Sequence, residues 1–300
     1  MIEFGLRIKK KRKAVSNSVA GFPYLQERIM KKNMYITILQ GMAVTAAFLI
    51  TEIVLNWLGA FDGAVRLYLV DISLRLIFGT IALVLLADNF KKQRNEHSVK
   101  ALFTNMISKR TYILLVPFLL YLIITMLTVI TGEGKELSFE FAGLYSLNCV
   151  QQLAVGYYEE GTRALIMCGL LKYCIDTKKN RLQIIFVSGI CFGLGHALNF
   201  FFGQDIVSTL WQVFHCFVWG LFIAAIYMLS KNLTLIMVMH AVWDIAIRVP
   251  KSFCILPENS VLLDGMNVLL TIIDYGILPA LAVYICINYD KLRGCSKSNI

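Results

Sequence analysis

The sequence predicts an all-α protein, a polytopic integral membrane helical bundle of about eight transmembrane helices. Of its 300 residues 58% are hydrophobic and only 16% are charged, and the mean hydropathy is +0.67. Soluble domains carry about 25% charged residues, so a soluble all-helical protein is the weaker alternative. Several apolar stretches of roughly 20 residues are long enough to cross a hydrocarbon core about 30 Å thick.

Eight apolar segments predict one helix each. They lie at residues 35–58, 66–87, 111–130, 142–171, 184–202, 207–229, 234–249 and 267–288. In the second segment, Asp71 and Arg75 are four residues apart and therefore share a helix face. We interpret them as an ion pair that faces the bundle, and favour a structural role over a functional one.

The basic residues are distributed as in a membrane protein, although the formal net charge of +10 is compatible with nucleic-acid binding. Lys and Arg gather in residues 1–34, 88–110 and 172–183, which flank apolar segments. The intervening connections are poorer in them, so we expect cytoplasmic N- and C-termini, no nucleic-acid partner, and the bilayer itself as a partner. The plasma membrane of a bacterium is the expected location.

Three of the last five predicted helices carry polar clusters, and ionisable residues inside a membrane favour a functional site. The first cluster contains Glu159, Glu160 and Arg163, in which both carboxylates can reach the guanidinium across one turn. A purely structural group is one interpretation. It leaves one of the two carboxylates without a cation, and that carboxylate is suited to act as a general base or acid.

The other two clusters contain histidines. Phe192, His196 and Asn199 lie in one segment, and His240 and Asp244 are four residues apart in another. A single histidine in an apolar helix is usually a packing residue, but two with polar neighbours at helical spacing favour a shared site. Together with the glutamates they would supply ligands for a divalent metal, or a base and hydrogen-bond donors for an activated water.

Other polar or small residues of these segments receive structural interpretations. We interpret His215 as a packing residue outside this site, and Gly193 and Gly195 as positions that let another helix or a substrate approach closely. The eight cysteines show no paired CxxC spacing, so we expect apolar packing rather than disulfides or a thiolate metal site.

The order of these motifs over residues 141–250 resembles the CPBP family of intramembrane metalloproteases. This group is also known as Abi or type II CAAX prenyl proteases, and includes Rce-like and lysostaphin-resistance-like proteins. The family motifs are two Glu, three residues, then Arg; Phe, three residues, then His; and His, three residues, then Asn or a similar polar residue. Phe192 with His196 fits the second, and His240 with Asp244 fits the third with Asp for Asn. The first motif departs from the family pattern, because one residue fewer separates Glu160 from Arg163.

The resemblance implies an intramembrane endopeptidase that hydrolyses a peptide bond through a water activated by glutamate and histidine. Its substrate would be a hydrophobic or membrane-anchored peptide, either of CAAX type or a bacteriocin or pheromone precursor. The implied catalytic residues are Glu159, Glu160, His196, His240 and Asp244, with Arg163, Asn199 and Phe192 in support. Zinc or another divalent metal held by Glu160, His196 and His240 is one option. A metal-free mechanism is equally compatible.

The shortened first motif leaves two alignments open. If Glu159 and Glu160 are the family pair, Arg163 is displaced by about 100° around the helix. If Arg163 is held fixed, Tyr158 takes the place of the first glutamate, and the chain is an inactive homologue. A non-catalytic bacteriocin self-immunity or scaffold protein is therefore the alternative function. A proton-coupled transporter is a third, disfavoured by the lack of internal repeats.

The resemblance and the hydropathy together divide the chain into four parts. These are a basic cytoplasmic N-terminal arm (1–34), variable N-terminal transmembrane helices (35–140), a catalytic transmembrane core (141–250), and the last transmembrane helix with a short cytoplasmic tail (251–300).

Overall fold

The computed structural model describes the backbone of residues 23–92, 103, 107–131, 139–173, 177–253 and 261–293. All eight predicted site residues fall within these ranges. Most of the predicted basic arm and the end of the predicted tail, residues 1–22 and 294–300, lie outside them. So do Cys174, Cys254 and Cys295, whereas the five other cysteines are free thiols.

The predicted all-α class is confirmed, since the described residues contain helices and no strand. The helices are α2 (Pro23–Trp57), α3 (Ala64–Lys92), α5 (Lys109–Leu114), α6 (Val116–Thr131), α7 (Phe139–Tyr173), α8 (Lys178–His196), the 3₁₀ helix η1 (Ala197–Phe202), α9 (Ile206–Ser230), α10 (Leu233–Phe253), α11 (Val261–Ile272), the π-helix η2 (Ile273–Ile277) and α12 (Leu278–Arg293). Each predicted apolar segment is thus mainly helical where it is described, but three segments do not form one helix each. Residues 111–130 are divided at Leu115 between α5 and α6, residues 184–202 pass from α8 into η1, and residues 267–288 pass through η2.

Five helical stretches are long and apolar enough to span a membrane. They are Tyr35–Trp57, Ala64–Asn89, Lys178–Phe202, Ile206–Ser230 and Asp264–Arg293. The chain is therefore a multi-pass membrane protein. The apolar parts of α6 and α10 are shorter, and α7 is interrupted by polar residues, so a total of eight spans stays a prediction.

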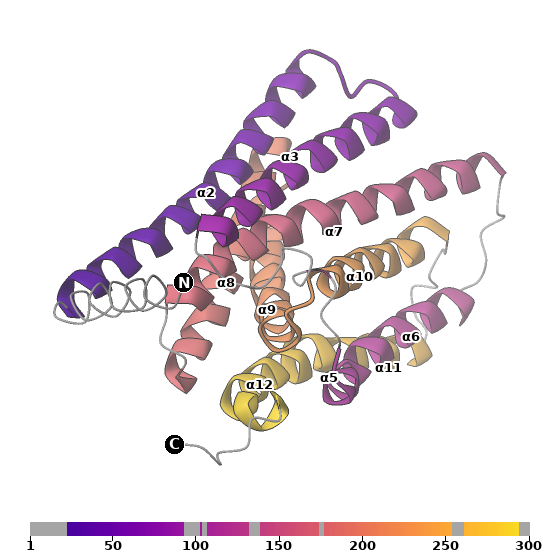
Figure 1. The fold of residues 1–300 in the computed structure, drawn as a ribbon. Helices are drawn as coiled ribbons and strands as arrows, with labels where there is room; N and C mark the ends of the chain where they lie inside the picture. Colours follow the sequence, from indigo (N-terminus) through magenta and orange to yellow (C-terminus); the bar gives the residue numbers. More distant parts are fainter. Residues whose placement is uncertain are drawn as a thin grey trace, which may run out of the picture.

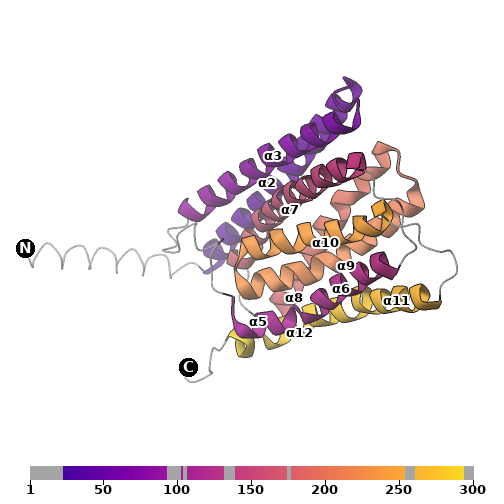
Figure 2. The ribbon, with the colours of Figure 1, turned by 90° about the vertical axis from the view of Figure 1, so that its right-hand side faces the viewer.

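The long helix α7 lies at the centre of the arrangement (Figure 1). It packs against α2 and α3 on one side and α10 on the other. The helices α8 and α9 form a second packed pair, and α12 covers α9. Figure 2 shows the same layers turned by 90°, with α3 outermost and α7 between it and α10. The site-bearing helices α7, α8 and α10 are thus brought together although they are separated in sequence.

Two glycines allow the close helix contacts on which this arrangement depends. A Cβ atom at Gly156 of α7 would lie 2.5 Å from the carbonyl oxygen of Met237 in α10. At Gly193 of α8 it would lie 2.7 Å from the carbonyl oxygen of Val213 in α9. Any larger residue would separate these helices. The predicted close approach at Gly193 is confirmed, whereas Gly195 has open space in front of it.

The connection between α8 and α9 is fixed by a helix cap. The carboxylate of Asp205 accepts a hydrogen bond of 2.9 Å from the backbone N–H of Ser208 at the start of α9. Hydrogen bonds from the side chain and backbone of Ser208 hold the pKa of Asp205 below its ordinary value. The cap places α9 directly after the 3₁₀ turn that follows His196.

Candidate active site

Residues of the helices α2, α3, α6, α7, α8, α9 and α10, together with η1 and η2, line a cavity of about 1060 Å³. Seven of the eight predicted site residues line it: Glu159, Arg163, Phe192, His196, Asn199, His240 and Asp244. The eighth, Glu160, does not. The two adjacent glutamates therefore have different environments.

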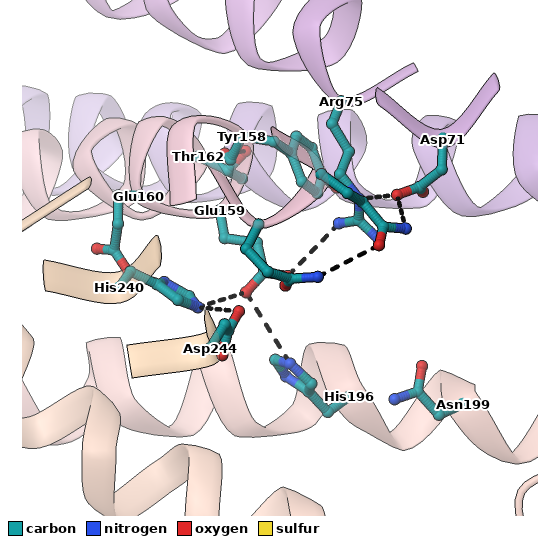
Figure 3. Close-up of polar contacts among 12 residues, drawn as sticks. Asp71, Arg75, Tyr158, Glu159, Glu160, Thr162, His196, Asn199, His240 and Asp244 are labelled. Atoms are coloured by element: carbon teal, nitrogen blue, oxygen red, sulfur yellow. Dashed lines mark hydrogen bonds and ion pairs between the residues drawn. The ribbon is translucent and has the colours of Figure 1, made fainter. Parts of the chain in front are cut away.

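Glu159 is the glutamate that faces the cavity, with 17% of its side chain exposed. Its Oε2 atom lies 3.6 Å from Nε2 of His240 and 3.9 Å from Nε2 of His196 (Figure 3). These separations exceed a direct hydrogen bond but suit a bridging water molecule. One carboxylate oxygen thus lies between two imidazoles from different helices.

Glu160 points away from the cavity and is fully buried. Its Oε1 atom accepts a hydrogen bond of 2.7 Å from Nδ1 of His240, and its Oε2 atom lies 3.1 Å from Nε of Arg163. Consecutive residues of an α-helix project about 100° apart, which explains why neighbouring glutamates reach different partners. Glu160 fixes the imidazole ring of His240 so that Nε2 faces the cavity.

Arg163 balances Glu160 rather than holding both carboxylates. Its guanidinium lies 3.7 Å from the centre of the Phe192 ring, and its NH1 group donates a hydrogen bond of 3.2 Å to the carbonyl oxygen of Gly220. Among the residues that the structure describes, the arginine within ion-pair distance of Glu159 is instead Arg75 of α3, at 3.6 Å from Oε1. The expectation that Arg163 positions both glutamates holds for Glu160 only.

Phe192 also organises the two histidines. Its ring contacts the imidazoles of His196 and His240 edge to face, with centroid distances of 4.9 Å and 5.8 Å. Its carbonyl oxygen lies 3.0 Å from Nδ1 of His196, which can donate to it. This bond leaves Nε2 of His196 directed toward Glu159. The Phe-to-His spacing of the motif therefore has a structural reason on α8.

Asn199 and Asp244 occupy the edges of the group. Asp244 Oδ2 lies 3.5 Å from Nε2 of His240, one turn away on α10. Asn199 lies on η1 and donates a hydrogen bond of 2.9 Å to Oε1 of Gln212 on α9. In Figure 3 Asn199 is set apart from the glutamates, and its hydrogen bond to Gln212 lies in the cavity wall.

The interpretation of His215 as a packing residue outside the site was wrong. His215 lines the same cavity, and its Nδ1 atom lies 3.0 Å from Oδ2 of Asp274 and 3.0 Å from the hydroxyl of Tyr275. Both partners belong to the π-helix η2. Single π-helical turns are frequent at functional sites. The sequence pattern has the 3.6-residue period of an α-helix and does not indicate where such a turn occurs.

The three suggested metal ligands do not converge. Glu160 contacts Nδ1 of His240, on the ring edge opposite the Nε2 atom that faces Glu159 and the cavity. Among the side chains that the structure describes, no three or more His, Cys, Asp or Glu residues are arranged to hold a metal ion. The three residues suggested as ligands therefore do not all face one point, and we derive no step through a zinc ion.

Comparison with known proteins identifies one family. Residues 143–246 match the Rce1-like type II CAAX prenyl endopeptidases, which confirms the resemblance of this part of the chain to the CPBP family. No curated protein and no solved structure matches the chain. All eight predicted site residues lie within the matched range, whereas Arg75 lies outside it.

Proposed function

We propose, from the Rce1-like domain of residues 143–246, that this membrane protein is an active intramembrane endopeptidase with Glu159 as its general base. The family implies a membrane protease acting on peptides. The observation that carries the assignment to this residue is the position of its carboxylate, which faces the cavity and lies within 4 Å of two imidazole Nε2 atoms. The fully buried Glu160 has no such access.

The proposed reaction begins with a water molecule held by Glu159 and His196. Their Oε2 and Nε2 atoms are 3.9 Å apart, which allows one water to contact both. The water oxygen attacks the scissile carbonyl carbon while Glu159 takes the proton. Glu159 then returns the proton to the departing amide nitrogen, and the C–N bond breaks. This is general acid–base catalysis without a covalent intermediate.

His240 is proposed to stabilise the oxygen that becomes negative. Its Nδ1–H donates to Glu160, and protonation of Nε2 would provide a second donor directed into the cavity. Glu160 on one side and Asp244 on the other compensate the imidazolium charge. Glu160 and Arg163 are therefore positioning residues. This metal-free route uses every member of the predicted group except Phe192, which packs against both histidines, and Asn199, which donates a hydrogen bond to Gln212 in the cavity wall.

The cavity favours a substrate that is largely apolar. Aromatic residues from four elements line it beside the polar group, namely Tyr121, Trp211, Trp219, Trp243 and Tyr275. We propose a hydrophobic or membrane-anchored peptide, either of CAAX type or a bacteriocin or pheromone precursor.

The experiment uses the full chain reconstituted in lipid nanodiscs. A quenched fluorescent peptide with a farnesylated CAAX end tests one substrate class, and mass spectrometry of new peptide termini in expressing membranes covers the others. We expect cleavage products with the wild-type chain that are absent with Glu159→Gln and with His196→Ala. Products that persist in the His196→Ala variant would overturn the proposal. Their absence with the folded wild-type chain in both assays would favour a non-catalytic immunity or scaffold protein.

A further inference from the structure

Arg75, which lies outside the matched family domain, takes part in the candidate active site. It belongs to α3 and lines the cavity, and its NH1 atom lies 3.6 Å from Oε1 of Glu159 (Figure 3). The same carboxylate presents its other oxygen, Oε2, to His196 and His240. Arg75 and the histidines therefore approach Glu159 from opposite sides.

Arg75 is itself held in place from two directions. Its Nε atom donates a hydrogen bond of 2.8 Å to Oδ2 of Asp71, one turn earlier on α3. The same oxygen accepts a hydrogen bond of 2.7 Å from Nε2 of Gln151 on α7. Hydrogen bonds that involve a charged partner are stronger and better defined than neutral ones. The chain of contacts starts on α7 at Gln151, crosses to α3, and returns to α7 at Glu159.

Aromatic rings further limit the positions that the guanidinium can adopt. It lies 5.1 Å from the ring centre of Phe48 on α2 and 5.9 Å from that of Tyr158 on α7. Only 16% of the side chain is exposed. A long flexible side chain is thereby fixed beside Glu159 without losing its opening to the cavity.

A purely structural Asp71–Arg75 pair does not account for these contacts. Asp71 already balances the charge of Arg75, so the pair by itself needs no contact with Glu159. Arg75 nevertheless extends past Asp71 to the cavity carboxylate. In the shortened motif, Arg163 forms an ion pair with Glu160. The cation at Glu159 comes from a different helix.

We propose that Arg75 is a positioning residue for the reaction, which fixes the Glu159 carboxylate so that Oε2 faces the attacking water. This inference rests on the proposed function. The groups that act electrostatically on Glu159 are His240, His196, Arg75 and Arg163, and Glu52 of α2 lines the same cavity. Arg75 is the only one of these groups supplied by α3. The N-terminal helices therefore contribute to catalysis as well as to packing.

The test compares Arg75→Gln and Arg75→Lys with Glu159→Gln, using the peptide that the wild-type chain cleaves. The matched control is Arg66→Gln, because Arg66 lies on the same helix with an exposed side chain and outside the cavity. We expect Arg75→Gln to lower kcat at least tenfold with little change in KM. The acidic limb of its pH profile should move to higher pH, because a carboxylate that loses a neighbouring cation binds a proton more readily. Arg75→Lys should leave the acidic limb of the pH profile at its wild-type position but lower kcat in part. Lys keeps the positive charge but lacks the planar guanidinium group.

The outcomes separate this inference from the proposed function. Wild-type kcat and pH profile in Arg75→Gln, with Glu159→Gln inactive, would overturn the role of Arg75 and leave the protease intact. A rise in KM alone would show that Arg75 binds substrate. That result would also overturn its role as a positioning residue for Glu159. If Arg75→Gln does not fold, Asp71→Asn replaces it, because this change alters the contacts of Asp71 with Arg75 and Gln151 but keeps the guanidinium. Normal kcat and pH profile in both Asp71→Asn and Arg75→Lys would then refute the proposal.

Discussion

The imidazole of His240 donates a hydrogen bond of 2.7 Å from Nδ1 to the carboxylate of Glu160, a residue that is fully buried. This bond determines which ring edge of His240 faces the cavity. It also accompanies a difference between the two neighbouring glutamates, because Glu159 lines the cavity and Glu160 does not.

We expect Glu159→Gln to affect mainly catalysis and Glu160→Gln to affect mainly stability. Loss of the general base in Glu159→Gln should lower kcat by about 10²- to 10⁴-fold, with little effect on unfolding. Glu160→Gln should keep measurable activity, because Gln can still accept the hydrogen bond from His240, but should be less stable. Steady-state kinetics and thermal unfolding in nanodiscs measure both effects. The reverse pattern would assign the base to Glu160.

The buried ion pair of Glu160 and Arg163 predicts how single and double substitutions change the free energy of unfolding. Removing one partner leaves a charge in the protein interior, so Glu160→Gln or Arg163→Met should each cost about 3–5 kcal/mol. The double variant should lose less than the sum, because it leaves neither charge without a partner. A double-mutant cycle on the free energy of unfolding checks this. Additive losses would show that the two side chains are not coupled.

The sequence predicted the helices and the polar residues of the site, because both depend on local spacing. Glu160 and His240 are 80 residues apart, and their hydrogen bond depends on how α7 and α10 are rotated against each other. Spacing along one helix does not fix that rotation. For this reason the motif alone does not determine which glutamate faces the cavity.

The residues that the sequence missed have similar explanations. Arg75 and Asp71 formed a complete ion pair on one helix face, so nothing local indicated a third partner on α7. His215 lies among apolar residues of α9, and its partner Asp274 is presented by a π-helix. Irregular turns of this kind are not visible in a 3.6-residue pattern.

The orientation of Glu160 predicts how the reaction responds to chelators. Because Glu160, His196 and His240 do not converge on one point, we expect 1,10-phenanthroline and EDTA to leave kcat/KM unchanged. Metal analysis of the purified chain should find less than one equivalent of zinc. A loss of activity that added Zn²⁺ restores would contradict the metal-free route.

Gly193 and Gly195 provide a matched test of the contact between α8 and α9. A Cβ atom at Gly193 would lie 2.7 Å from the carbonyl oxygen of Val213, whereas one at Gly195 would meet nothing within 4 Å. We expect Gly193→Ala to destabilise the protein by about 1–3 kcal/mol through overpacking. It should also lower kcat, because His196 lies less than one turn away on the same helix. Gly195→Ala should be neutral or stabilising by about 0.5–1 kcal/mol, since Ala is the better helix former. Unfolding in nanodiscs and peptide cleavage measure both, and equal behaviour of the two variants would contradict the close approach of α8 and α9.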